Sequence, residues 1–128
     1  MFDLILALAL LSTPDLHCLA DNIYHEARGE PYLGRLAVGH VTINRAKSKK
    51  FKGDTICAVV KRPNQFSWYK GRIHKHNNIP YQKALSLAKA ILARQTKDPT
   101  NGATFFKTSR PHHNKYKKIG NHYFYWKF

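Results

Sequence analysis

Apolar residues recur at three- and four-residue intervals between positions 14 and 28, and this spacing constrains the fold more than any other feature of the sequence. It predicts an amphipathic helix. Thr13-Pro14-Asp15 favours a helix start, because threonine can cap the exposed amides and proline suits the first helical position. Gly29 and Pro31 end the pattern. The apolar stripe consists of Leu16, Leu19, Ala20, Ile23 and Ala27.

Three further segments predict helices. Residues 32–46 are apolar on more than one face, as expected for a central helix surrounded by protein. Asp54-Thr55 can cap a short helix that ends at Pro63. Pro80 opens a longer helix, whose pattern ends in the turn-forming residues 98–102.

The C-terminal part of the chain predicts strands. Residues 103–106 and 122–127 are typical of short strands, and a basic, histidine-containing loop over 107–120 separates them. We therefore predict a mainly α fold of the α+β class, with a small C-terminal β-hairpin, in a single domain spanning residues 1–128.

The N-terminal residues include an apolar run from Leu4 to Leu11 that is too short to span a bilayer. An export signal is the alternative to a packed helix over residues 1–12. The run follows Asp3 rather than a basic segment, and no small-x-small cleavage site comes after it. We favour the packed helix and expect no stable membrane anchor.

The chain carries 22 Lys and Arg against 7 Asp and Glu, a formal net charge of +15. A positive charge of this size attracts polyanions to the surface, and the charge is larger than a small domain needs for solubility. Nucleic acid, anionic lipid and the bacterial wall are the partners that this charge allows.

The two cysteines, Cys18 and Cys57, have no metal-type spacing such as CxxC. They are either two thiols or one disulfide, and composition alone does not decide between these.

The only two glutamates, Glu26 and Glu30, lie in the segment 22–30. On a helix they would be one turn apart and able to face the same groove. Solvated helix-end charges are the alternative, but the adjoining Tyr24 and His25 favour a site. A carboxyl partly enclosed by aromatic rings keeps its proton near neutral pH and can donate it to a leaving oxygen.

Glycoside hydrolysis usually needs a second carboxylate, and no convincing partner for Glu26 is present. The acidic residues that we considered for this role are Glu30, Asp21, Asp54 and Asp98.

The eight histidines form no HExxH pattern, so we expect no metal site and no cofactor. His74, His76 and His112-His113 lie in basic loops without a nearby carboxylate in the sequence, which is typical of solvated side chains. His25 and His40 lie inside predicted helices, where we expect satisfied core or groove residues.

Several motifs, in the same order, resemble those of the SleB-like cell-wall hydrolases. The most specific is Cys18-Leu-Ala-x-x-Ile-Tyr-His-Glu-Ala-Arg-Gly-Glu-Pro31, and the resemblance extends over about residues 15–126. The other matching stretches are Gly34-x-Leu-Ala-Val, Val41-x-x-Asn-Arg45, Thr55-Ile-Cys-x-Val-Val60, Gln65-Phe-Ser-Trp68, Asp98-Pro-Thr-x-Gly-Ala-Thr104 and Ile119-Gly-x-His-x-Phe-Tyr125.

The resemblance implies a lysozyme-like, lytic-transglycosylase-related domain that cleaves peptidoglycan glycan strands. It implies that Glu26 is the catalytic acid and that Glu30 is structural or auxiliary. It also makes a disulfide between Cys18 and Cys57 the favoured state. The residues that it implies for substrate binding are Asn44, Gln65, Ser67, Trp68 and Tyr125.

Such an enzyme would act at the bacterial cell wall, in the periplasm or outside the cell, as a phage endolysin or an autolysin. We expect a monomer whose basic surface also binds anionic wall polymers. The sequence departs from the family at Phe105-Phe106-Lys107 and in the unusually basic loop after Trp68.

Two alternatives remain open. One is a catalytically silent wall-binding or virion component on the same fold. The other is a basic nucleic-acid-binding protein, because basic and aromatic residues alternate in 66–72 and 116–128. No recognisable nucleic-acid-binding module is present, so we expect no specific nucleic-acid partner.

Overall fold

Four helices and a small sheet make up the part of the chain that the computed structural model describes, residues 14–48, 55–62, 65–73 and 76–126. The helices are α2 (Pro14–Ala27), α3 (Tyr32–Lys47), α4 (Ile56–Lys61) and α5 (Ile79–Leu92). This arrangement confirms the predicted mainly α fold of the α+β class. The predicted helix over residues 1–12 lies outside the described residues.

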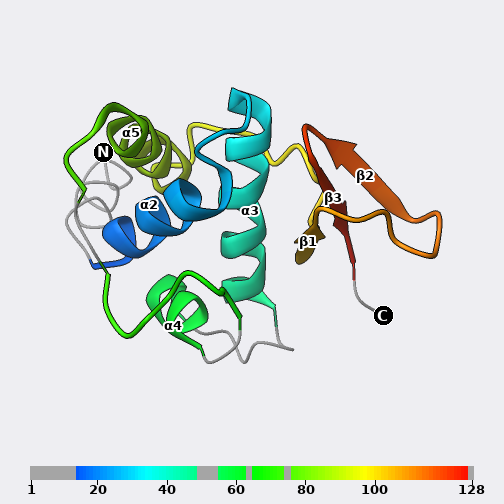
Figure 1. The fold of residues 1–128 in the computed structure, drawn as a ribbon, viewed down its shortest axis with the longest axis horizontal. Helices are drawn as coiled ribbons and strands as arrows, with labels where there is room; N and C mark the ends of the chain where they lie inside the picture. Colours follow the sequence, from blue (N-terminus) through cyan, green and yellow to red (C-terminus); the bar gives the residue numbers. More distant parts are fainter. Residues whose placement is uncertain (1–13, 49–54, 63–64, 74–75, 127–128) are drawn as a thin grey trace.

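Helix α3 stands between the other helices and the sheet (Figure 1). It contacts α2, α4 and α5 on one side and strands of the sheet on the other. Gly39 leaves room for the side chains of α2 and α5, because a β-carbon there would lie 2.5 Å from Cδ1 of Ile91 and 3.1 Å from Cδ1 of Ile23, which would have to move. The prediction that this helix is central is therefore confirmed.

The apolar stripe predicted on α2 is buried, from Leu16 to Ile23 in the cluster with α4 and α5 and at Ala27 in the cluster with α3 and the sheet. Leu19, Ala20 and Ile23 have no exposed surface. A second core cluster lies between α3 and the sheet, where Val38 and Val41 meet Phe124. No helix in the described ranges combines the length and the apolar character needed to cross a membrane.

The antiparallel sheet has the order β1-β3-β2, so the last strand lies in the middle. Its strands are β1 (Phe105–Lys107), β2 (Tyr116–Ile119) and β3 (His122–Tyr125). The prediction of a loop throughout 107–120 is wrong over β2. Two successive lysines of β2 are exposed, which hides any alternation, whereas Ile119 is buried and the Tyr116 ring packs edge-on against Tyr123.

Side chains cap the two helices that follow loops. The Thr55 hydroxyl accepts a hydrogen bond from the Ala58 amide at the start of α4, as the sequence predicted for the Asp54-Thr55 pair. The Asn78 side chain accepts one from the Tyr81 amide, so α5 begins just before Pro80.

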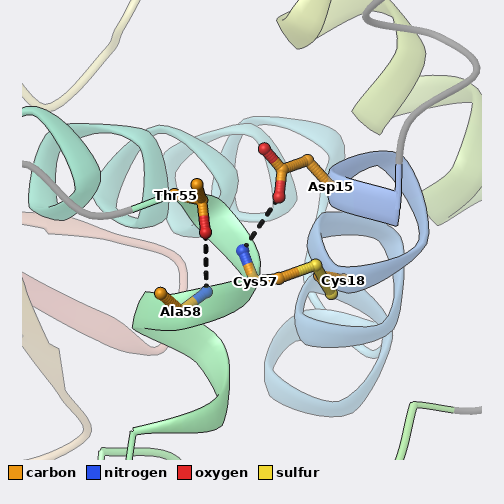
Figure 2. The surroundings of a disulfide bond; sticks show 5 residues. All are labelled: Asp15, Cys18, Thr55, Cys57 and Ala58. Atoms are coloured by element: carbon orange, nitrogen blue, oxygen red, sulfur yellow. Dashed lines mark hydrogen bonds between the residues drawn. A yellow bond between two sulfur atoms is a disulfide. The ribbon is translucent and has the colours of Figure 1, made fainter.

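A disulfide between Cys18 and Cys57 joins α2 to the first turn of α4 (Figure 2). Beside it, the Asp15 carboxylate accepts a hydrogen bond of 3.0 Å from the Cys57 amide. The two contacts attach the N-terminal turns of α2 and α4 to each other.

Reduction of this disulfide is expected to lower the free energy of unfolding by about 3 to 4 kcal/mol, because the bridge closes a loop with a sequence separation of 39. Urea unfolding with and without a thiol reductant measures the difference. A Cys18→Ala/Cys57→Ala variant is the control and should not respond to the reductant. Equal stability of the oxidised and reduced wild-type protein would contradict this role.

Candidate active site

Glu26 lies in the last turn of α2 and lines an open pocket of about 380 Å³. The pocket is formed where the end of α2, the last turns of α3, the segment after α4 and strand β1 meet. Its other lining residues are Arg45, Gln65, Phe66, Ser67 and Phe106. Gln65 and Ser67, two of the residues implied for substrate binding, thus lie in the same pocket as Glu26.

Burial raises the pKa of the Glu26 carboxyl above its ordinary value, and the nearby Arg45 charge opposes part of this effect. The acid is therefore held in a site that favours its protonated form, with a cation close enough to stabilise the carboxylate once the proton has left. Both properties suit a group that donates and later accepts a proton.

Arg45 is held in place by α3 and by the residues around it. Its Nε donates a hydrogen bond of 2.6 Å to the Thr104 carbonyl, and its guanidinium lies 5.0 Å from the Phe66 ring and 5.2 Å from the Phe105 ring. Burial lowers its pKa to about 10, against the opposing charges of Glu26 and Tyr125. At neutral pH the side chain remains a cation.

Trp68 lies beside the Glu26 pocket rather than in its wall. It lines an adjacent hollow of about 550 Å³ with His25, His76 and the basic residues Lys70 and Arg72. Its ring stacks on His25 at 4.6 Å, and its Nε1 donates a 2.9 Å hydrogen bond to the buried Asn22. The indole is thus fixed against α2.

Asn44 braces the turn before β1. Its amide nitrogen donates hydrogen bonds of 2.9 Å to the Asp98 carboxylate and to the Ala103 carbonyl. Burial alone would raise the pKa of Asp98, but the hydrogen bonds from Asn44, Thr100 and Gly102 together lower it. The side-chain amide of Asn44 thus donates its hydrogen bonds within the protein. Asp98 is held in its ionised form, in which it accepts hydrogen bonds from the turn.

Tyr125, at the end of β3, stacks on Phe105 of β1 at 5.7 Å. The Lys107 ammonium lies 5.5 Å from the Tyr125 ring. Tyr125 does not line the Glu26 pocket.

Glu30 does not line the pocket of Glu26, so the two glutamates do not face one groove, as their spacing on a continuous helix would have allowed. Helix α2 ends at Ala27, which breaks the one-turn relation between the two glutamates. The Glu30 carboxylate instead accepts hydrogen bonds of 2.7 and 3.0 Å from the backbone and side chain of Asn121 and lies 3.3 Å from His122. It ties the α2–α3 connection to the β2–β3 turn.

This tie requires Gly120 in the turn. Its φ is +60°, and a β-carbon at this position would lie 2.5 Å from the Glu30 carboxylate oxygen.

The expectation that His76 has no carboxylate nearby is also wrong. Its Nε2 lies 2.9 Å from Oδ1 of the fully buried Asp21, and its ring stacks on Tyr24 at 4.5 Å. The two residues are 55 positions apart, so the sequence did not show their contact.

Comparison with known proteins decides the family. The sequence profile of the Cell Wall Hydrolase family matches residues 29–125. The chain belongs to this family. The resemblance to SleB-like cell-wall hydrolases is thereby confirmed.

Relatives and solved structures agree with this membership. The chain is 33% identical to a spore cortex-lytic enzyme of Bacillus cereus over 88% of its length, and 32% identical over the same share to that of Halalkalibacterium halodurans. It spans 44% and 35% of those relatives. The chain thus spans less than half the length of these curated relatives.

Two solved structures have the same fold. The catalytic domain of the Bacillus cereus SleB protein superimposes with a TM-score of 0.67 at 32% identity, covering 86% of this chain and 88% of that domain. The catalytic domain of the germination-specific lytic transglycosylase SleB from Bacillus anthracis superimposes with a TM-score of 0.68 at 31% identity. The match covers 88% of this chain and 94% of that domain. The fold expected from the resemblance is confirmed.

Sequence reasoning missed three residues of the pocket in this cell wall hydrolase family member. Arg45 and Phe66 were noted only as parts of motifs, and nothing in the spacing of the predicted helices distinguishes Arg45 from the other basic residues of the same helix. Phe106 was noted only as a departure from the family. Its place beside Glu26 depends on the pairing of β1 with β3, which sequence periodicity does not reveal.

Replacing Glu30 with glutamine is expected to destabilise the protein by about 1 to 3 kcal/mol, because the amide cannot replace a carboxylate that accepts two hydrogen bonds from Asn121. Urea unfolding measures the loss. A variant as stable as the wild type would contradict the assigned role of this tie.

Replacing Glu26 with glutamine is expected to have the opposite effect and to raise the free energy of unfolding at neutral pH. Because burial raises the pKa of Glu26, the folded protein binds this proton more tightly than the unfolded chain does. Wild-type stability therefore falls as the pH rises from the ordinary glutamate pKa through the raised folded value.

The gain from Glu26→Gln should accordingly be absent in acid and grow with pH across this window. Urea unfolding at a series of pH values measures it, and Glu30→Gln serves as the matched control at the other glutamate. If Glu26→Gln is less stable than the wild type at neutral pH, the raised pKa is contradicted.

Proposed function

We propose that this chain cleaves the glycan strands of peptidoglycan, with Glu26 as general acid and then general base. The observation that carries the proposal is the place of Glu26, a carboxyl with a burial-raised pKa in a pocket with Gln65 and Ser67. Family membership and the printed function of the relatives, spore cortex lysis, support this class of substrate.

The other carboxylates of the described residues are engaged away from the Glu26 pocket. Asp15 accepts from the Cys57 amide, Asp21 lies against His25 and His76, Glu30 binds Asn121, and Asp98 holds the turn before β1. None of them lines the pocket. Retaining and inverting glycosidases both place two carboxylates at the bond that is cut, so this arrangement favours a route that needs one.

In the proposed route, protonated Glu26 donates its proton to the glycosidic oxygen while the bond between that oxygen and C1 of the muramyl sugar breaks. The carbonyl oxygen of the substrate's own N-acetyl group stabilises the positive charge that develops at C1. The resulting Glu26 carboxylate is stabilised by the Arg45 charge.

The second step returns the proton. The muramyl 6-hydroxyl attacks C1 and gives its proton to Glu26, which forms a 1,6-anhydro ring and regenerates the acid. No water is consumed, and the reaction is a lytic transglycosylation rather than a hydrolysis.

The surface of the chain suits this substrate. A formal charge of +15 favours a wall whose peptides and attached polymers are anionic. The aromatic rings of Phe106 in the pocket and Trp68 beside it offer apolar faces on which sugars can stack. We propose that the protein acts on the wall as a monomer through this face.

Glu26→Gln is expected to lower the rate at which soluble fragments are released from purified peptidoglycan by at least about a hundredfold, the usual contribution of a general acid. The variant should still sediment with the wall, because it keeps the charged surface. Release at the wild-type rate would contradict the mechanism. Wall binding without release by the wild-type protein would instead identify a catalytically silent wall-binding component.

A further inference from the structure

Three potential metal ligands converge at α2, the helix that also carries Glu26. Asp21 and His25 are one turn apart on α2, and His76 comes from the segment before α5. The His25 and His76 Nε2 atoms lie 3.2 and 2.9 Å from the same Asp21 oxygen. One ligand atom from each residue lies within 4.8 Å of the other two.

We propose that Asp21, His25 and His76 form a binding site for a divalent transition-metal cation of the Zn²⁺ type. Two imidazole nitrogens and one carboxylate oxygen are a ligand set that suits zinc, and the remaining coordination position would hold water. An oxygen-only set would instead favour calcium or magnesium, and this site has two nitrogen donors.

The site is partly enclosed by the protein. Asp21 has no exposed surface, and His25 and His76 are each 24% exposed at the side chain. The ion would therefore bind at the edge of the protein, against a fully desolvated carboxylate, with a path of entry from the hollow that the two histidines line. A buried carboxylate of this kind needs positive charge to offset its lost hydration.

Tyr81 gives an independent indication of a further group at this place. It is 3% exposed, its ring lies 5.3 Å from that of His76, and its hydroxyl has no hydrogen-bond partner among the described residues. Buried hydroxyls are rarely left without a partner. A water molecule on the bound cation would provide one.

The site would fix the loop that carries Trp68. That indole stacks on His25, and His76 belongs to the same loop, which α4 and α5 flank. A bound ion would join α2 to His76, near the end of this loop that leads into α5. It would thereby hold the hollow beside Glu26 in a single conformation. In this account the metal positions residues and takes no part in the transfer of protons by Glu26.

Hydrogen bonding alone is the competing explanation, with each imidazole donating to Asp21. The two accounts differ in what happens when metal is added. Calorimetric titration of the full chain with Zn²⁺, after chelator treatment, is expected to show one tight equivalent per chain. His76→Gln should weaken Zn²⁺ binding at least about tenfold. Loss of a residue that only hydrogen-bonds to a metal ligand already has an effect of this size, and loss of the ligand itself should have a larger one.

His112→Gln is the matched control, because His112 is an exposed histidine outside the site. It should leave the tight equivalent unchanged. If the wild-type protein and His76→Gln bind Zn²⁺ with the same stoichiometry and affinity, the proposal is overturned and the contacts are hydrogen bonds only.

A second measurement does not depend on how a variant folds. Wild-type protein titrated with Co²⁺ should develop the intense visible absorption of a four-coordinate site at one equivalent, and Zn²⁺ should displace it. The weak spectrum of six-coordinate cobalt throughout the titration would overturn the proposal. Neither experiment uses peptidoglycan, so both stand apart from the test of the proposed enzyme activity.

Discussion

Burial of α2 between α3, α4 and α5 is the constraint on which the rest of the structure depends. Leu19 and Ile23 are completely buried, and Gly39 of α3 leaves room for the tip of the Ile23 side chain. Because α2 is buried along its length, Glu26 in its last turn is also partly buried. The raised pKa of the acid is thus a consequence of how the helical core packs.

Hydrogen bonds of polar side chains hold the turns and connections that the hydrophobic core does not fix. Glu30 attaches the α2–α3 connection to the β2–β3 turn, Asp98 organises the turn before β1, and Arg45 binds the Thr104 carbonyl just before β1. These contacts link the helices to the sheet through charged or amide side chains, whereas the disulfide links two helices. The pocket lies where the two parts meet, so its walls depend on both kinds of connection.

The local features of this fold could be predicted from sequence, and the long-range ones could not. Helix boundaries followed from apolar spacing, Pro80 and the Thr55 cap, because these signals act within a few residues. Strand β2 was missed because its partner β3, rather than its own alternation, makes it a strand. Glu26 was singled out through its motif and lies in a pocket with Gln65 and Ser67, whereas the contact between His76 and Asp21 depends on a loop that brings together residues far apart in the chain.

The central claim is that one carboxyl, Glu26, performs both proton transfers, and the chemical ends of the products test it most directly. Mass spectrometry of the muropeptides released from purified peptidoglycan distinguishes the two possible ends. The account predicts 1,6-anhydro-muramyl ends, because the sugar's own hydroxyl closes on C1 and, among the residues that the structure describes, no second carboxylate lines the pocket to activate water. Reducing, hydrated ends would contradict it and would require a water-activating group that this account does not contain.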